Sequence, residues 1–109
     1  MKFNEVMHLS FYTDQLDEMR DFYENKLGLK AKIIMRYEAY KGKSSRGAWA
    51  KRAETNPKDI AYIFIELAPG QYLELFPKAD GQGEYIKPDT HLGYSHFALM
   101  VDDIHEARE

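Results

Sequence analysis

Apolar and polar residues alternate along residues 5–13, the pattern of a β-strand that buries one of its faces. One side of this strand would carry Val6, His8, Ser10 and Tyr12, and the other side Met7, Leu9 and Phe11. The period then becomes helical over residues 15–27, with Asp14 as the expected N-cap and Gly28 as the expected C-cap. The chain is therefore predicted to begin with a strand and an amphipathic helix.

Four further strands are predicted downstream, over residues 29–37, 60–67, 71–76 and 94–101. A turn at Pro69-Gly70 would join the second and third of these into a hairpin. Residues 38–59 are polar and contain glycines and a proline, which predicts a long basic loop or a hairpin excursion. Residues 77–92 are rich in glycine, proline and aspartate and predict a connector.

The end of the chain resembles its beginning. With His96 placed on His8, the stretch HFALMVDDIHEARE lies over HLSFYTDQLDEMRD. The shared histidine, strand pattern and helix start indicate an internal duplication. In the second copy, Asp102 or Asp103 would cap a helix that begins at Ile104.

A chain of 109 residues allows one domain, and it contains no cysteine for disulfides or thiolate sites. We expect an α+β fold of β-α-β-β-β modules: one complete copy with its connector over residues 1–92, and the first strand and helix start of a second over residues 93–109. The net charge of -3 argues against a nucleic-acid partner. No apolar run approaches the ~18 residues of a membrane span, and no signal-peptide pattern opens the sequence. We therefore expect a cytoplasmic protein without a membrane partner.

Three ionisable side chains interrupt strands that are otherwise apolar: His8, Glu74 and His96. Burying such a group is costly unless it is paired or binds a ligand. Two imidazoles and a carboxylate form a donor set that suits Zn, Ni, Co, Mn or Fe(II). Each of the three could instead face solvent or form a hydrogen bond of its own, because strand faces are often half exposed. The pattern favours a divalent metal site of open identity.

A doubled module with these residues resembles the vicinal oxygen chelate superfamily. The resemblance spans nearly the whole chain and is carried by VMHLSFYT, DQLDEMRDFYENKLGLK, YLELF and GYSHFALMVDDI. Members of this superfamily include lactoylglutathione lyase (glyoxalase I), methylmalonyl-CoA epimerase, extradiol dioxygenases and bleomycin-resistance proteins. The pattern is most similar to glyoxalase I, which implies a metal-dependent lyase or isomerase that acts on the thiol hemithioacetal of a 2-oxoaldehyde. A non-catalytic drug-resistance-type binding protein, an epimerase and a dioxygenase are the alternatives.

The glyoxalase I branch holds its metal with four side chains, and the resemblance assigns three of them to His8, Glu74 and His96. The fourth is a glutamate on the last strand of a second module, and residues 1–109 offer no counterpart. In the family that glutamate does most of the proton transfer, so the resemblance leaves Glu74 as the catalytic carboxylate here. A further segment of a longer protein or another chain would then complete the site; a deletion that leaves a folded half is the remaining alternative.

The resemblance and the basic stretch together suggest a substrate-binding set of Arg36, Arg46, Trp49 and Arg52. The arginines could receive a carboxylate or phosphate of a thiol cofactor or of coenzyme A, and the indole could cap a pocket. A solvated loop that binds nothing is the alternative. An unpaired fifth strand would be an exposed apolar edge, so we expect a second copy to cover it in a homodimer. The expected partners are thus a small-molecule substrate and a second copy of the chain.

Overall fold

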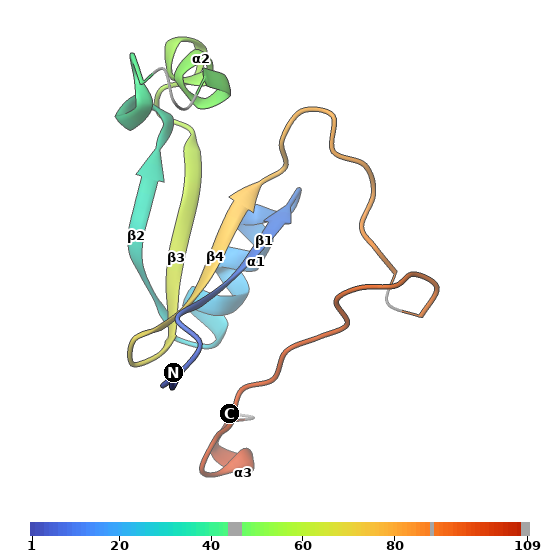
Figure 1. Ribbon diagram of the computed structural model, residues 1–109. Coiled ribbons are helices and arrows are strands. Elements are labelled where there is room, and N and C mark those ends of the chain that lie inside the picture. Colours follow the sequence, from blue (N-terminus) through green and yellow to red (C-terminus); the bar gives the residue numbers. More distant parts are fainter. Residues whose placement is uncertain (44–46, 88, 108–109) are drawn as a thin grey trace.

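A four-stranded mixed sheet forms the centre of the structure, with the strand order β1-β4-β3-β2 (Figure 1). Its strands are β1 (His8–Thr13), β2 (Lys30–Arg36), β3 (Ile60–Ala68) and β4 (Gln71–Pro77). β1 runs parallel to β4, and the other two neighbouring pairs are antiparallel. The computed structural model describes residues 1–43, 47–87 and 89–107. Within these ranges the predicted α+β class and the β-α-β-β-β order of the first module are confirmed.

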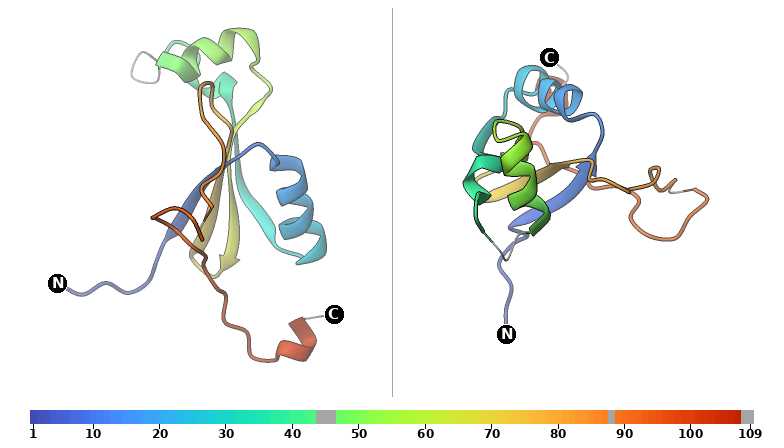
Figure 2. Two further views of the ribbon diagram at one scale, coloured as in Figure 1. Left: turned by 90° about the vertical axis from the view of Figure 1, so that its right-hand side faces the viewer. Right: turned by 90° about the horizontal axis from the view of Figure 1, so that it is seen from above.

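One face of the sheet is covered by a helix (Figure 2). The helix predicted over residues 15–27 is present as α1 (Leu16–Arg20), which continues into the wider π-helical segment η1 (Asp21–Lys26). It ends at Gly28, whose φ of 72° is easily reached only by glycine. The next amide along the chain donates a hydrogen bond to the carbonyl of Tyr23 at 3.0 Å. This bond is typical of a glycine C-cap, so the predicted helix end is confirmed.

Asp14 does not cap this helix, and the sequence prediction on that point is wrong. The N-cap residue is Gln15, which makes no side-chain cap bond; its amide donates to Thr13 Oγ1 at 2.9 Å. The Asp14 carboxylate accepts a hydrogen bond from the Tyr85 hydroxyl at 2.8 Å instead. The same hydroxyl accepts from the Asp14 amide at 3.0 Å and lies 3.0 Å from Thr13 Oγ1. A residue of the connector therefore engages the Asp14 carboxylate, and no side chain caps the helix at its N-cap residue Gln15.

The core lies between the sheet and α1. Its fully buried side chains are Ile63, Ile65, Leu73 and Leu75 from the two central strands. Leu9 and Phe11 of β1 pack against them from the edge, and Leu16 and Met19 from the helix. The alternation of residues along β1 thus places the apolar set that the sequence predicts on the covered face.

In the described structure, residues 38–59 form neither the long loop nor the hairpin excursion that the sequence predicts. They contain the end of the 3-10 turn η2 (Tyr37–Tyr40) and the helix α2 (Gly47–Thr55). α2 is rich in alanine, lysine and arginine, all strong helix formers. Its buried residue is Ala53, which lies in a small second core with Tyr37. α2 has only a narrow apolar stripe, so the helical period of apolar residues is weak and the sequence of this segment resembles that of a polar loop.

Residues 94–101 form no strand in the described structure, although the sequence predicts one. Tyr94 and Phe97 instead contact the ring of Phe11, with ring centroids 5.1 and 5.9 Å apart. β1 pairs with the last strand of its own module, and the described residues hold no corresponding strand for a second module. A strand needs a neighbour for its backbone hydrogen bonds. Within the described residues, ring contacts of Tyr94 and Phe97 attach this segment to β1.

The last helix begins where the sequence repeat places it. α3 (Ile104–Ala107) is capped by the carboxylate of Asp103, which accepts the amides of His105 and Glu106 at 2.9 and 3.3 Å. Between β4 and α3 the chain loops out from the sheet and touches it again at Phe11 (Figure 1). The radius of gyration of 16.3 Å exceeds the roughly 13 Å of a compact domain of this length. Among the described helices, none combines the length and apolarity needed to cross a membrane.

Replacing Leu75 with alanine should lower the free energy of unfolding by about 2–5 kcal/mol, because the side chain is fully buried and its removal leaves a cavity. Urea unfolding followed by circular dichroism measures this change. The matched control is Leu92→Ala, since Leu92 is 98% exposed and should change stability by less than about 0.5 kcal/mol. Equal losses in the two variants would contradict the described core.

Replacing Tyr85 with phenylalanine should release the connector from the end of β1, because the hydroxyl bonds both Thr13 and Asp14. Hydrogen bonds of this kind each contribute about 0.5–3 kcal/mol, the most when one group is charged. Limited proteolysis should then cut the connector faster than in the wild type, and Tyr94→Phe serves as the control. Unchanged cleavage of the Tyr85→Phe connector would show that these bonds do not hold it in solution.

Candidate functional site

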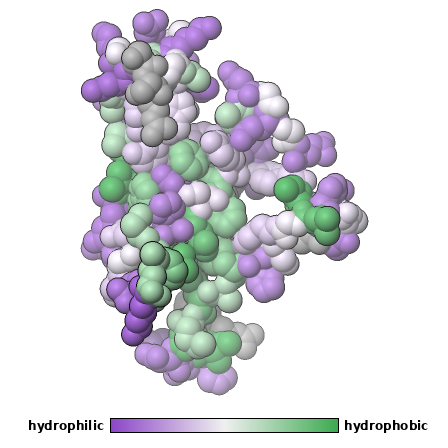
Figure 3. Space-filling view, viewed as in Figure 1, coloured by the Kyte–Doolittle hydropathy of each residue, from purple (hydrophilic) through white to green (hydrophobic). Residues whose placement is uncertain are grey.

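The face of the sheet opposite α1 carries no helix in the described parts of the chain, and it is the face seen in Figure 1. We call it the open face; it is formed by alternate residues of β1, β3 and β4, namely His8, Ser10, Tyr12, Tyr62, Phe64, Tyr72, Glu74 and Phe76. These positions are partly or fully exposed, whereas their neighbours in the two central strands are buried. Figure 3 looks onto this face and shows apolar and polar residues mixed over the sheet, hydrophilic residues around α2, and residues of both kinds along the connector.

His8, Ser10 and Glu74 meet on the open face. The parallel register places Ser10 directly beside Glu74 and His8 beside Tyr72. The Ser10 hydroxyl donates a hydrogen bond to Glu74 Oε1 at 2.7 Å, and His8 Nε2 lies 3.7 Å from the same oxygen. The Glu74 side chain is 13% exposed and that of His8 36%. A carboxylate this enclosed needs polar partners, and these two residues supply them.

The spacing of this pair suits a shared metal ion. Two donors that each lie about 2.0–2.2 Å from a tetrahedral ion are roughly 3.3–3.6 Å apart, close to the separation of His8 Nε2 and Glu74 Oε1. The third predicted ligand is not beside them: His96 is exposed, and its Nδ1 lies 3.2 Å from the hydroxyl of Ser95. Among the described residues of the chain, no three histidine, aspartate or glutamate side chains lie close enough together to bind one metal ion. The residues present thus fit part of a metal site, and the triad stays a prediction.

Aromatic rings line the open face beside this pair. The Tyr12 and Phe76 rings stack with centroids 4.9 Å apart, and the His8 ring meets the edge of Phe64 at 5.6 Å. Trp49 extends the aromatic surface from α2, since its indole lies 5.8 Å from the Tyr62 ring and 6.2 Å from the Phe76 ring. Trp49 was predicted from the sequence to bind substrate, but no such role was predicted for the rings of β3 and β4. Their period of two along the strands, shared with His8 and Glu74, was the signal that could have found them.

The predicted substrate-binding arginines have local partners. Arg36 donates to the carbonyl of Lys58 at 2.7 Å. The guanidinium of Arg52 lies 5.2 Å from the centre of the Tyr37 ring and 3.5 Å from the Asp59 carboxylate. Burial raises the pKa of the Tyr37 phenol, and the nearby Arg52 charge opposes that rise. Arg46 lies outside the described residues.

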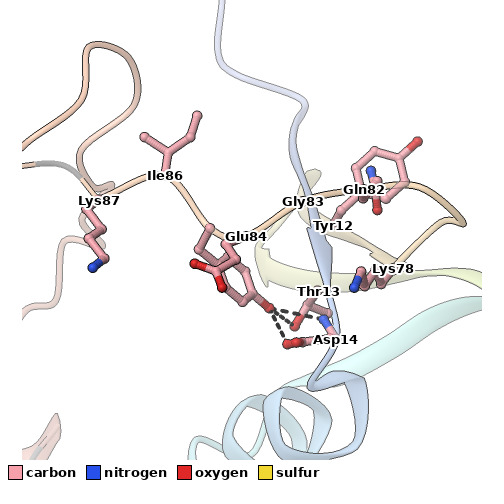
Figure 4. A pocket seen from close by; sticks show the side chains of 10 residues that line it. Tyr12, Thr13, Asp14, Lys78, Gln82, Gly83, Glu84, Ile86 and Lys87 are labelled. Carbon is pink, nitrogen blue, oxygen red and sulfur yellow. Dashed lines mark hydrogen bonds between the residues drawn. The ribbon is translucent and has the colours of Figure 1, made fainter.

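A cavity of about 780 Å³ opens elsewhere, where the connector passes the end of β1 (Figure 4). Its lining comprises Tyr12, Thr13, Asp14, Lys78, Gln82, Gly83, Glu84, Tyr85, Ile86 and Lys87. The lining has two acidic and two basic residues and therefore no charge preference, and neither His8 nor Glu74 belongs to it. We accordingly place the candidate site at the His8–Glu74 pair, where groups able to ligate a metal or move a proton meet.

Comparison with known proteins agrees with this fold. The family model of the Glyoxalase/Bleomycin resistance protein/Dioxygenase superfamily matches residues 5–109, a range that includes the whole sheet. No curated protein and no solved structure matches the chain. Because the family match covers nearly the full length, the chain belongs to the Glyoxalase/Bleomycin resistance protein/Dioxygenase superfamily.

Proposed function

We propose that this protein is a metal-dependent lyase or isomerase of the glyoxalase I type, which acts on the thiol hemithioacetal of a 2-oxoaldehyde. The observation that carries the proposal is the pairing of His8 Nε2 with Glu74 Oε1 at 3.7 Å on an otherwise aromatic face. An imidazole and a carboxylate at this separation can share one Zn, Ni, Co, Mn or Fe(II) ion. His96 is the proposed third ligand and would have to come from another copy or from a rearranged segment.

Each part of the site has a role in this proposal. A bound divalent ion would act as a Lewis acid toward the two adjacent oxygens of the substrate. The Glu74 carboxylate would move a proton between the neighbouring carbons, which requires a positioned base within hydrogen-bond reach. Trp49 and the rings of the open face would exclude water and hold the apolar part of the substrate. Arg36, Arg46 and Arg52 are the proposed partners of its anionic groups.

A homodimer belongs to the same proposal. Residues 94–101 have no ladder partner in the described chain, and they carry apolar side chains that are largely exposed, among them Leu99 and Met100. Pairing with the sheet of a second copy would give the backbone N–H and C=O groups of these residues hydrogen-bond partners and would cover this apolar surface. A two-fold arrangement would also bring a second set of ligands to the region of the site.

A second candidate function is that of a non-catalytic binding protein of the drug-resistance type. The aromatic rings favour it, because Trp49, Tyr62 and Phe76 form a continuous surface on which a flat apolar ligand could stack without a metal. The metal content of the purified protein separates the two functions. A folded, metal-free protein that binds an aromatic ligand would favour this second candidate.

The first test is the metal content of the wild type and of ligand variants. Wild-type protein should bind one divalent ion per site, whereas His8→Ala and Glu74→Gln should each bind substoichiometric metal, since each loses a donor of the pair. Elemental analysis after dialysis gives the ratio. Glu66→Gln is the matched control, because this carboxylate pairs with Lys32 at 3.9 Å and should leave the metal content unchanged. Wild-type protein that folds and takes up no divalent ion would reject the metal-dependent function.

The second test is the oligomeric state. Sedimentation at micromolar concentration should show a dimer for the wild type and a monomer for Met100→Asp, because an aspartate would place a charge in the covered apolar segment. Leu92→Asp is the control, since its side chain is 98% exposed, against 97% for Met100, and lies in the connector. A soluble wild-type monomer would rule out the proposed dimer while leaving the metal test intact.

A further inference from the structure

Ser10 is the closest polar neighbour that the structure gives to the Glu74 carboxylate. The two residues are register partners in the parallel β1–β4 ladder, so their side chains leave adjacent strands at the same height on the open face. The Ser10 hydroxyl donates to Glu74 Oε1 at 2.7 Å. That length is the usual one for a well-formed hydrogen bond between a hydroxyl and an oxygen acceptor.

The bond determines what the carboxylate can still do. A serine hydroxyl has one hydrogen to donate, and here it is used on the same oxygen that faces His8 Nε2. A carboxylate offers about four lone-pair positions, so the bond fixes the side chain while leaving positions free for an ion or a proton. A free glutamate side chain loses rotamer entropy when it is ordered. If Glu74 is already ordered in the metal-free protein, the binding of the ion does not have to pay this entropy cost.

We propose that Ser10 is a positioning residue of the site: it holds the Glu74 carboxylate in the orientation that meets His8, and so raises the affinity for the divalent ion without touching it. This inference rests on the proposed metal site. Groups that orient a metal ligand in this way typically change metal affinity by about 10- to 100-fold. The hydroxyl is the operative group, so a residue that keeps it should preserve the effect.

Calorimetric titration of the full-length, metal-free protein with Zn²⁺ tests the proposal. Ser10→Ala should bind Zn²⁺ about 10- to 100-fold more weakly than the wild type. Ser10→Thr keeps the hydroxyl, and the exposed position has room for its extra methyl group, so it should bind as the wild type does. Thr90→Ala is the control, since it removes a surface hydroxyl that contacts His91 and not the site.

A second measurement does not depend on metal. The side-chain carbons of Glu74 should be more mobile in metal-free Ser10→Ala than in metal-free wild type, as read by ¹³C relaxation. If the wild type binds Zn²⁺, and Ser10→Ala matches it in both affinity and Glu74 mobility, the positioning role is wrong. Equal weakening in Ser10→Thr and Ser10→Ala would also overturn it, because the hydroxyl would then not matter. If the wild type does not bind Zn²⁺, but Glu74 is still more mobile in Ser10→Ala than in the wild type, Ser10 orients Glu74 and the metal site itself is rejected.

Discussion

The parallel ladder between β1 and β4 is the contact on which the rest of the structure depends. It brings residues from the start of the chain beside residues more than sixty positions later, as in the pair Ser10 and Glu74. A parallel pair cannot be closed by a tight turn, so the chain must pass through α1, β2 and β3 before it returns. That path places α1 over one face of the sheet and leaves the opposite face open. The separation of core and site thus follows from one strand pairing.

The register of this ladder decides the chemistry. Side chains of a strand alternate between its faces, so a slip by one residue would turn His8 and Ser10 into the core and expose Leu9 and Phe11. The buried leucines of β4 prevent that slip, because the apolar residues of β1 pack against them. The carboxylate of Glu74 then meets an imidazole and a hydroxyl in an aromatic surrounding. Core packing and site geometry are therefore set by the same hydrophobic pattern.

Local patterns were enough to predict most of the first module. The alternation in β1, the glycine that ends the helix at Gly28 and the Pro69-Gly70 hairpin are signals that act over a few residues, and each is found as expected. The resemblance to the superfamily rested on the stretches around His8, Glu74 and His96 and on the first helix, and the family match confirms the superfamily. The hydrogen bond from Ser10 was missed, although its position two residues after His8 already put both on one face.

The features that the sequence did not reveal depend on partners distant along the chain. α2 is stabilised by burying Ala53 beside Tyr37, a contact that no local periodicity displays. The Asp14 carboxylate accepts a hydrogen bond from the Tyr85 hydroxyl and does not cap the helix that follows it. Residues 94–101 have the composition of a strand, but composition cannot supply the neighbour that a strand requires. The proposed third ligand, His96, lies in this same segment, so its placement depends on the missing neighbour as well.

The central claim is that His8 and Glu74 bind one divalent ion on the open face. X-ray absorption spectroscopy at the metal edge, on wild-type protein loaded with one equivalent of Zn²⁺, tests it most directly. If the two residues share the ion, its ligand atoms are nitrogen and oxygen at about 2.0–2.2 Å, and the scattering from the outer atoms of an imidazole ring disappears or weakens in His8→Ala. A spectrum of hydrated zinc without imidazole scattering, or one that His8→Ala leaves unchanged, would show that His8 and Glu74 do not bind the ion.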